Sequence, residues 1–216
     1  MNKRQIKMNY RNVTGVASSQ KVSRLIQFES TLEYAAIIHF EYETGIPFYD
    51  EQPITLQYIL EDEKRRYTPD FLVNVRKTNS LFNVVGNYLI EIKHRSDLWK
   101  NWNELKPKFV AAKKHAKEHG MKFKILTDNE LRTPYFENIQ FLNRYKHIDI
   151  QSADANEMMN IIHEHRSLTV QELLNKISTD KWYQARVIPL IWNKIFNRLI
   201  IADLTVPLTM KTIIHW

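Results

Sequence analysis

The sequence predicts an α/β protein of two domains, in which a mixed sheet flanked by helices is followed by a smaller domain. Strand-like apolar segments separated by short polar stretches lie between Ile54 and Lys93, which predicts neighbouring antiparallel strands. A helical segment from Asp97 to His119 leads into one more strand, Met121 to Asp128, so a crossover returns the chain to the sheet. Composition changes near residues 147–153, where we expect the linker between the domains.

The first domain, residues 28–147, is expected to follow a basic N-terminal arm, residues 1–27. Phe28 to Gly45 predicts a helix, because apolar residues recur at helical spacing until the glycine. The chain is then expected to turn through Pro47. The expected strands are ITLQYIL (54–60), YTPDFLVNV (67–75) and NYLIEIK (87–93), with the charged run EDEKRR as the turn between the first two.

Two more helical regions complete the first domain. Pro107 is expected to begin a new helix within the segment from Asp97 to His119, since proline would otherwise kink a continuous helix. Residues 136–145 predict another helix.

The second domain, residues 152–216, is expected to be a small winged helix. Its three helical segments are expected at residues 157–163, 169–177 and 181–197. Thr169 and Ser178 are expected helix caps. Two strand-like segments, RLIIADL and TMKTIIHW, would form the wing.

Composition narrows the class of partner. The formal net charge is +7, which favours a polyanionic partner and nucleic acid above all. The chain has no cysteine, so disulfides and cysteine-based zinc sites are excluded. The lack of cysteine is consistent with a protein of a reducing compartment. Without an apolar run long enough to cross a bilayer or a signal-peptide core, we expect a cytoplasmic protein with no membrane partner.

Two apolar strands carry ionisable residues at their ends. Side chains at i and i+2 share a face of a strand, so Glu91 and Lys93 point together, and Asp70 opens the preceding strand. If the strands pair, Asp70 lies beside Glu91 and Lys93. Two carboxylates this close repel unless a cation sits between them, and hard oxygen ligands with open positions suit Mg²⁺ or Mn²⁺.

A third carboxylate would come from the first helix. Glu33 lies on its apolar stripe, and Glu29 stands one turn earlier, so the spacing leaves the choice between them open. Lys93 would steady an attacking water or neutralise charge on the phosphate, which makes the set a phosphodiesterase constellation. The alternative is that each strand-end charge is simply solvated.

At these residues the sequence resembles the PD-(D/E)xK nuclease superfamily, with Pro69-Asp70 and Glu91-Ile92-Lys93 as the motif. Within it, the chain is most similar to the TnsA-type transposon endonucleases. The similar segments include ESTLEYAAIIHFEYE, YTPDFLV, YLIEIK, KPKF and ILTDNELR, and they cover nearly all of residues 11–145. The resemblance implies a restriction-endonuclease-like fold with Glu33, Asp70, Glu91 and Lys93 as the active site.

The resemblance also implies an activity and its partners. Members of the family cut the 5′, non-transferred strands at transposon ends, with Mg²⁺ held here by Asp70, Glu91 and Glu33, and Mn²⁺ as a substitute. The implied partners are double-stranded transposon-end DNA, an integrase-type transposase and an AAA+ ATPase regulator. The alternatives are a restriction- or repair-type nuclease that acts alone, and a non-catalytic winged-helix scaffold that binds DNA.

The helix after the motif supplies candidate DNA contacts. We expect the phosphates of duplex DNA to contact the polar side of this helix. The alternative is that this side only faces solvent. The lysines on this side are Lys106, Lys108, Lys113, Lys114 and Lys117.

Overall fold

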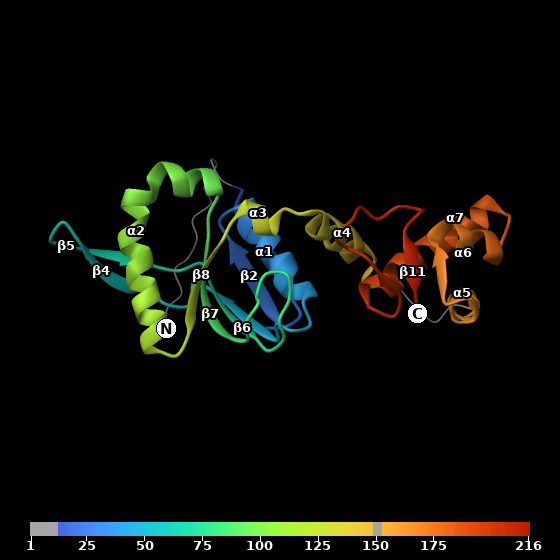
Figure 1. The fold of residues 1–216 in the computed structure, drawn as a ribbon, viewed down its shortest axis with the longest axis horizontal. Coiled ribbons are helices and arrows are strands. Elements are labelled where there is room, and N and C mark those ends of the chain that lie inside the picture. Colours follow the sequence, from blue (N-terminus) through green and yellow to red (C-terminus); the bar gives the residue numbers. More distant parts are fainter. Residues whose placement is uncertain (1–12, 149–152) are drawn as a thin grey trace. The chain divides into compact units, whose positions relative to one another are not determined.

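The computed structural model describes residues 13–148 and 153–216 in two compact units, Met1–Arg132 and Thr133–Trp216 (Figure 1). The boundary therefore lies upstream of the predicted linker at 147–153. As a result α4, Pro134–Leu142, belongs to the second unit, whereas the sequence placed this helix in the first domain.

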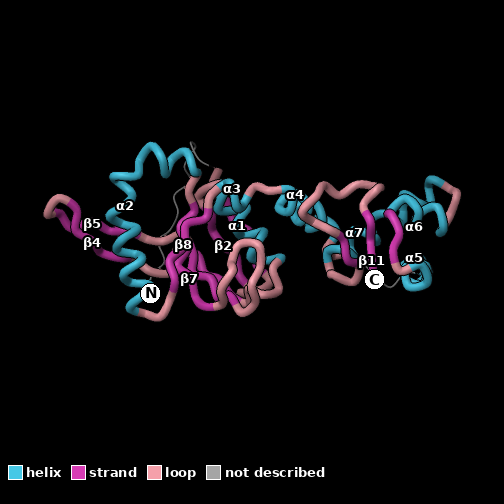
Figure 2. Tube along the Cα trace, viewed as in Figure 1, coloured by secondary structure: helices cyan, strands magenta, loops and turns pink. Residues whose placement is uncertain are grey.

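A four-stranded mixed sheet forms the centre of the first unit. Its strands are β3 (Phe48–Glu51), β6 (Phe71–Val75), β7 (Gly86–Ile92) and β8 (Lys122–Leu126), in the order β3-β6-β7-β8. The first two pairs are antiparallel, and β8 runs parallel to β7. The crossover between β7 and β8 is α2, Arg95–Glu118, which Figures 1 and 2 show beside the sheet. The predicted mixed α/β fold and its crossover are confirmed.

The two faces of this sheet pack against different helices. On one face, Phe40 of α1 (Thr31–Tyr42) contacts Phe71 of β6, with ring centroids 5.4 Å apart. On the other face, Phe109 of α2 contacts Phe123 of β8, with ring centroids 5.9 Å apart. Both faces of β7 are covered, so the strand reads as a nearly continuous apolar run. Glu91 interrupts that run on the face that carries Phe123, because β7 and β8 pair Leu89 with Phe123.

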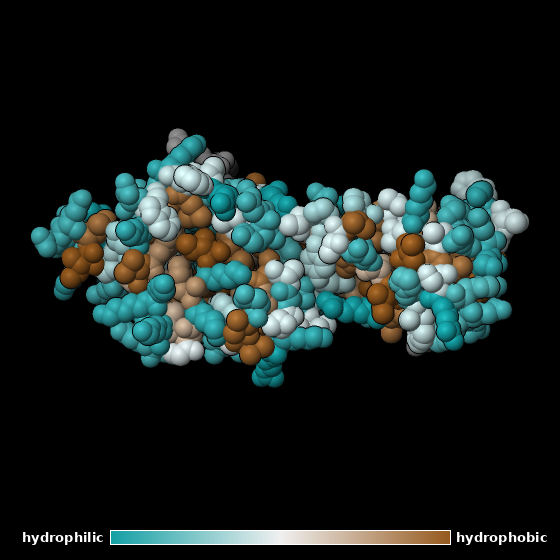
Figure 3. All heavy atoms as spheres, viewed as in Figure 1, coloured by the Kyte–Doolittle hydropathy of each residue, from teal (hydrophilic) through white to brown (hydrophobic). Residues whose placement is uncertain are grey.

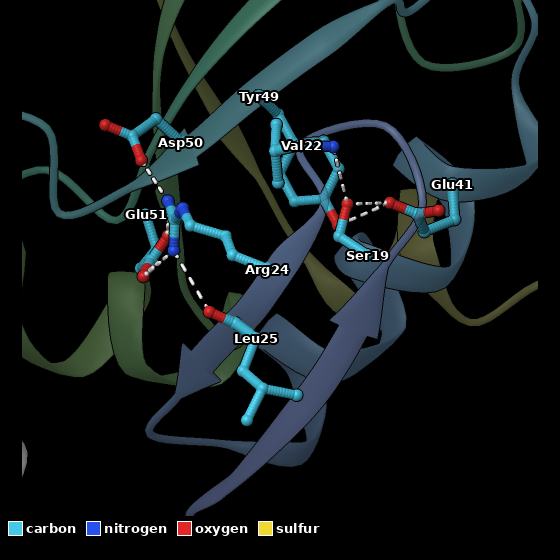
Figure 4. Close-up of polar contacts among 8 residues, drawn as sticks. All are labelled: Ser19, Val22, Arg24, Leu25, Glu41, Tyr49, Asp50 and Glu51. Carbon is cyan, nitrogen blue, oxygen red and sulfur yellow. Dashed lines mark hydrogen bonds and ion pairs between the residues drawn. The ribbon is translucent and has the colours of Figure 1, made fainter.

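Residues 15–28 form a hairpin, although the sequence suggested an arm. Strands β1 (Gly15–Ser19) and β2 (Arg24–Phe28) pair antiparallel, while residues 1–12 lie outside the described residues. Figure 4 shows Arg24 reaching Asp50 and Glu51 of β3, and Ser19 reaching Glu41 of α1. The basic residues of this segment therefore serve packing within the unit. Lys21 likewise donates to the carbonyl oxygens of Phe40, Glu43 and Ile46 around the end of α1.

A second hairpin contains the run EDEKRR, which the sequence assigned to a turn. Strand β4 (Leu56–Leu60) pairs with β5 (Glu63–Tyr67) and not with the central sheet, so the predicted three-strand meander is wrong. The turn itself is Glu61-Asp62, and both residues have positive φ, 51° and 61°. Figure 3 shows hydrophobic surface over this hairpin, where Ile59 is exposed.

Helix α2 is not broken at the expected place. The backbone leaves helical geometry at Asn101 (φ −115°, ψ 20°), and Pro107 lies inside the helix. Pro107 therefore does not begin a helix. Figure 1 shows that α2 is bent.

The second unit combines helices with a three-stranded antiparallel sheet of order β10-β11-β9. Its elements after α4 are η1 (Asn143–Tyr145), α5 (Ala153–His165), β9 (Ser167–Thr169), α6 (Val170–Ile177), α7 (Lys181–Phe196), β10 (Ile201–Ala202) and β11 (Ile213–His215). Thr169 caps α6 as expected, whereas Ser178 ends α6 and Asp180 caps α7. The winged-helix assignment stays a prediction. Among the described helices, none is long and apolar enough to cross a membrane.

His39 of α1 is buried and donates from Nε2 to the carbonyl oxygen of Leu131, at the end of α3 (Asp128–Leu131), over 3.1 Å. Burial lowers the pKa of His39 despite opposing effects of this carbonyl and of Glu43. The unfolded chain therefore takes up a proton near pH 6.5 that the folded protein does not, and stability falls as pH drops below that value.

We expect the wild-type protein to lose stability relative to His39→Gln by up to about 1.4 kcal/mol per pH unit below pH 6.5. Urea unfolding at several values between pH 7.5 and 5 measures this slope. His215→Gln, at an exposed histidine, is the control and should follow the wild-type slope. Parallel curves for wild type and His39→Gln would contradict the assignment.

Candidate active site

The structure places Asp70 immediately before β6, where backbone bonds fix it from both sides. Its N–H donates to the carbonyl oxygen of Ile90 (3.0 Å), and its own carbonyl accepts from the N–H of Gln52 (2.8 Å). Its side-chain Oδ2 accepts from the N–H of Ile92 (2.6 Å). Pro69 sits one residue outside the ladder, so no donor is lost. Asp70 is thus held beside Glu91, as the sequence predicted.

The Glu91 carboxylate is almost fully buried, at 1% exposure, and has three donors around it. The Tyr67 hydroxyl donates to Oε2 over 2.6 Å. The ammonium of Lys108 donates to Oε1 over 3.1 Å, and the ammonium of Lys93 lies 3.5 Å from the same oxygen. These donors come from β5, from α2 and from the residue after β7, so three separate elements converge on one carboxylate.

Crowding of negative charge dominates the electrostatics. Burial raises the pKa of Asp70 well above its usual value, and the charges of Glu91 and Glu33 raise it further, against the opposing effects of Lys93 and the Ile92 N–H. Burial alone would lower the pKa of Lys93, but Glu91, Asp70 and Glu33 outweigh it and raise that pKa. Burial and Glu91 also raise the pKa of Tyr67, so its phenol stays protonated and remains a donor.

The structure distinguishes Glu33, which lies in α1, from Glu29, which precedes the helix although the sequence predicted a helix from Phe28. Glu33 accepts from the Glu29 N–H (2.8 Å) and from the Ser30 hydroxyl (2.9 Å), so it also caps the start of α1. Burial raises its pKa, which Lys93 partly offsets. Its charge acts on both Asp70 and Lys93. Glu29 instead accepts from the Gln52 side chain (3.0 Å).

The donors suit a hard divalent cation. Asp70 and Glu91 are neighbouring carboxylates whose repulsion such a cation would relieve, and Mg²⁺ is commonly held by one or two carboxylates with water and phosphate as further ligands. In residues 13–148 and 153–216, no group of three His, Cys, Asp or Glu side chains is arranged to hold a metal. Asp70 and Glu91 supply oxygen donors of the right kind, and their role as metal ligands, like that of Glu33, stays a prediction.

The lysines of α2 do not form one class. Lys106, Lys113, Lys114 and Lys117 are exposed, and Figure 3 shows a hydrophilic surface along the C-terminal part of this helix. Lys108 instead turns inward to Glu91, with only 18% of its side chain exposed.

The sequence analysis named Lys108 only as a candidate DNA contact and did not name Tyr67, and it missed the contact of both with Glu91. One signal was available for Lys108, which lies three residues after Leu105 and four before Ala112, on the apolar stripe of the helix. A lysine on such a stripe needs a buried partner. Tyr67 carried no comparable signal.

The mixed sheet flanked by helices, with Asp70, Glu91 and Lys93 at one end, places the first unit in the restriction-endonuclease-like class. The family description "TnsA-like endonuclease N terminal" matches residues 45–128, and "TnsA endonuclease C terminal" matches residues 130–204. The chain therefore belongs to the TnsA-type transposon endonucleases, the endonuclease subunits of Tn7-like transposases. A search of the curated proteins gave no match.

Proposed function

We propose that the protein is the Mg²⁺-dependent subunit that cleaves the 5′, non-transferred strands at transposon ends, with Mn²⁺ able to substitute. The observation that carries this proposal is that Asp70, which accepts from the Ile92 N–H, lies at the same sheet end as Glu91 and Lys93, whose charged groups are 3.5 Å apart. Family membership of both halves of the chain supports the DNA substrate and the transposition context.

Each residue has a distinct part in this proposal. Asp70 and Glu91 would hold Mg²⁺, and Glu33 would complete or orient that set. When bound, the ion supplies Lewis-acid stabilisation of charge on the phosphoryl oxygens. Lys93 places an ammonium among the carboxylates, where it positions the attacking water and neutralises charge that develops at phosphorus. Tyr67 fixes the rotamer of Glu91 through its 2.6 Å hydrogen bond.

The DNA and protein partners follow from the same proposal. The DNA contacts on α2 would be Lys106, Lys113, Lys114 and Lys117, and the second unit would contact an integrase-type transposase and an AAA+ ATPase regulator. The partners would position the DNA, because the sequence of the nuclease domain, residues 28–147, offers no strong base-reading element. The protein alone would then cleave weakly.

A strand-resolved cleavage assay tests this function. A duplex with a transposon end is labelled on each strand in turn and incubated with Mg²⁺, with and without the partner transposase. We expect cuts in the non-transferred strand only when the transposase is present.

Two other results would contradict this proposal. Efficient cleavage of plain duplex DNA without the transposase would indicate a nuclease that acts alone. Stable binding to the transposase–DNA complex with no cleavage in Mg²⁺ or Mn²⁺ would indicate a non-catalytic scaffold.

A further inference from the structure

Lys108 differs from the other lysines of α2 in its burial and its contacts. Its ammonium donates to Oε1 of Glu91 over 3.1 Å. The same ammonium lies 4.8 Å from the ring centroid of Tyr67 and 5.3 Å from that of Phe109. A cation over an aromatic face is stabilised there, so this ammonium is held by one carboxylate and two rings. Random solvation of a surface lysine does not account for such a set of contacts.

The oxygens of Glu91 offer few positions for another cation. A carboxylate oxygen has two lone pairs, and Oε1 already faces the ammonium groups of Lys108 and Lys93. Oε2 accepts from the Tyr67 hydroxyl. A divalent cation that approaches Oε1 therefore meets two positive charges within a few ångströms. Like charges at this distance repel strongly in a poorly hydrated site.

We propose that Lys108 and the divalent cation compete for Oε1 of Glu91, so that Lys108 must leave this oxygen before the metal binds there. This inference rests on the proposed function, because it takes Glu91 as a metal ligand. Lys93 is less suited to leave. It follows β7 directly, and its N–H donates to the carbonyl oxygen of Leu126, whereas Lys108 reaches Glu91 from a different element.

Competition gives Lys108 a role that a simple positioning residue would not have. If Lys108 only oriented Glu91, its removal would weaken metal binding. If Lys108 competes with the metal, its removal must tighten metal binding, because a repulsive charge is lost while Tyr67 still holds Oε2. The sign of the change in affinity therefore distinguishes the two roles.

The test is the affinity of the full chain for Mn²⁺ without DNA, measured by electron paramagnetic resonance and by isothermal titration calorimetry. Lys108→Met keeps the apolar stem against Tyr67 and Phe109 and removes the charge. We expect Mn²⁺ affinity to rise about tenfold in this variant, the change that 1.4 kcal/mol of removed repulsion produces. Lys108→Arg keeps the charge and should stay near the wild-type affinity. Circular dichroism and thermal unfolding confirm that each variant is folded.

Two further variants separate the possible causes. Lys100→Met removes an exposed charge from the same helix and should change affinity less than twofold. Asp70→Asn should weaken Mn²⁺ binding in the wild-type background. If Asp70→Asn has no effect, the metal site itself is misplaced and the proposed function falls with this inference.

If Asp70→Asn weakens binding but Lys108→Met leaves it unchanged or weaker, only the competition is overturned. The same holds if Lys100→Met or Lys108→Arg tightens binding as much as Lys108→Met does.

Discussion

Replacing Asp70 with asparagine is expected to lower the rate of DNA cleavage by roughly a thousandfold or more, a loss of about 4 kcal/mol of transition-state stabilisation. The substitution removes a charge from the position where the proposed Mg²⁺ site lies. It keeps the local geometry, because an amide oxygen can still accept from the Ile92 N–H that now donates to Oδ2. The loss should appear at saturating Mg²⁺ in single-turnover cleavage of a labelled transposon end.

The same variant should fold as well as the wild type at neutral pH. The pKa of Asp70 is raised by burial and by Glu91 and Glu33, so its contribution to stability is full below pH 4 and is lost as pH rises. Asparagine has no such loss, and the melting temperature at pH 7 should be unchanged or higher. Asp62→Asn, at an exposed turn residue, is the matched control and should retain wild-type cleavage. Cleavage by Asp70→Asn within threefold of wild type would refute the catalytic assignment.

Replacing Lys93 with methionine is expected to cost roughly a hundredfold in the cleavage step, the size of effect seen when one preorganised donor to a developing anion is removed. Only one third of the Lys93 side chain is exposed, and its ammonium lies 3.5 Å from Glu91 Oε1. Methionine keeps most of the stem but cannot donate to a water molecule or to a phosphate oxygen. DNA binding by the assembled complex, measured by mobility shift, should change little.

The control for this experiment is Lys100→Met, which removes an exposed charge from α2. It should cleave at the wild-type rate, so that a general loss of positive charge is excluded as the cause. Lys93→Arg should recover part of the activity because it restores a cation. Full activity of Lys93→Met would show that the charge is dispensable, and the proposed role would then be wrong.

The sequence contained enough to place the centre of the site. Alternation along two strands put Glu91 and Lys93 on one face, and the pairing of Phe71 with Ile90 brings Asp70 beside Glu91. This expectation used strand periodicity, the position of Pro69 and the assumption that these two successive strands pair.

Contacts between distant elements were not predictable in the same way. Lys108 contacts Glu91 because the crossover helix α2 packs on the face of the sheet that carries Phe123 and Glu91. Tyr67 contacts Glu91 because β5 ends close to that carboxylate. Strand β5 was itself missed. Its turn has positive φ at Glu61 and Asp62, where a type I′ hairpin is normally recognised by asparagine or glycine.

The N-terminal strands were missed for a related reason. Lys21 and Arg24 look like solvent-exposed basic residues in the sequence, and β3 has the polar sequence FYDE. In the fold, Arg24 of β2 pairs with Asp50 and the buried Glu51 of β3, so the charges of the two strands neutralise one another. A buried ion pair can be seen only once the fold brings its partners together.

The link between Arg24 and β3 also bears on where a working fragment of this protein can start. The matched family segment begins at residue 45, but a fragment cut there would lose Arg24, the guanidinium partner of Glu51, together with the whole of α1 and its Glu33. Gln52, the residue after Glu51, donates its N–H to the carbonyl of Asp70. A change in β3 would therefore be passed to Asp70, the proposed metal ligand, through the hydrogen bond from Gln52. The segment that matches the family is thus shorter than the part of the chain that keeps the site in its geometry.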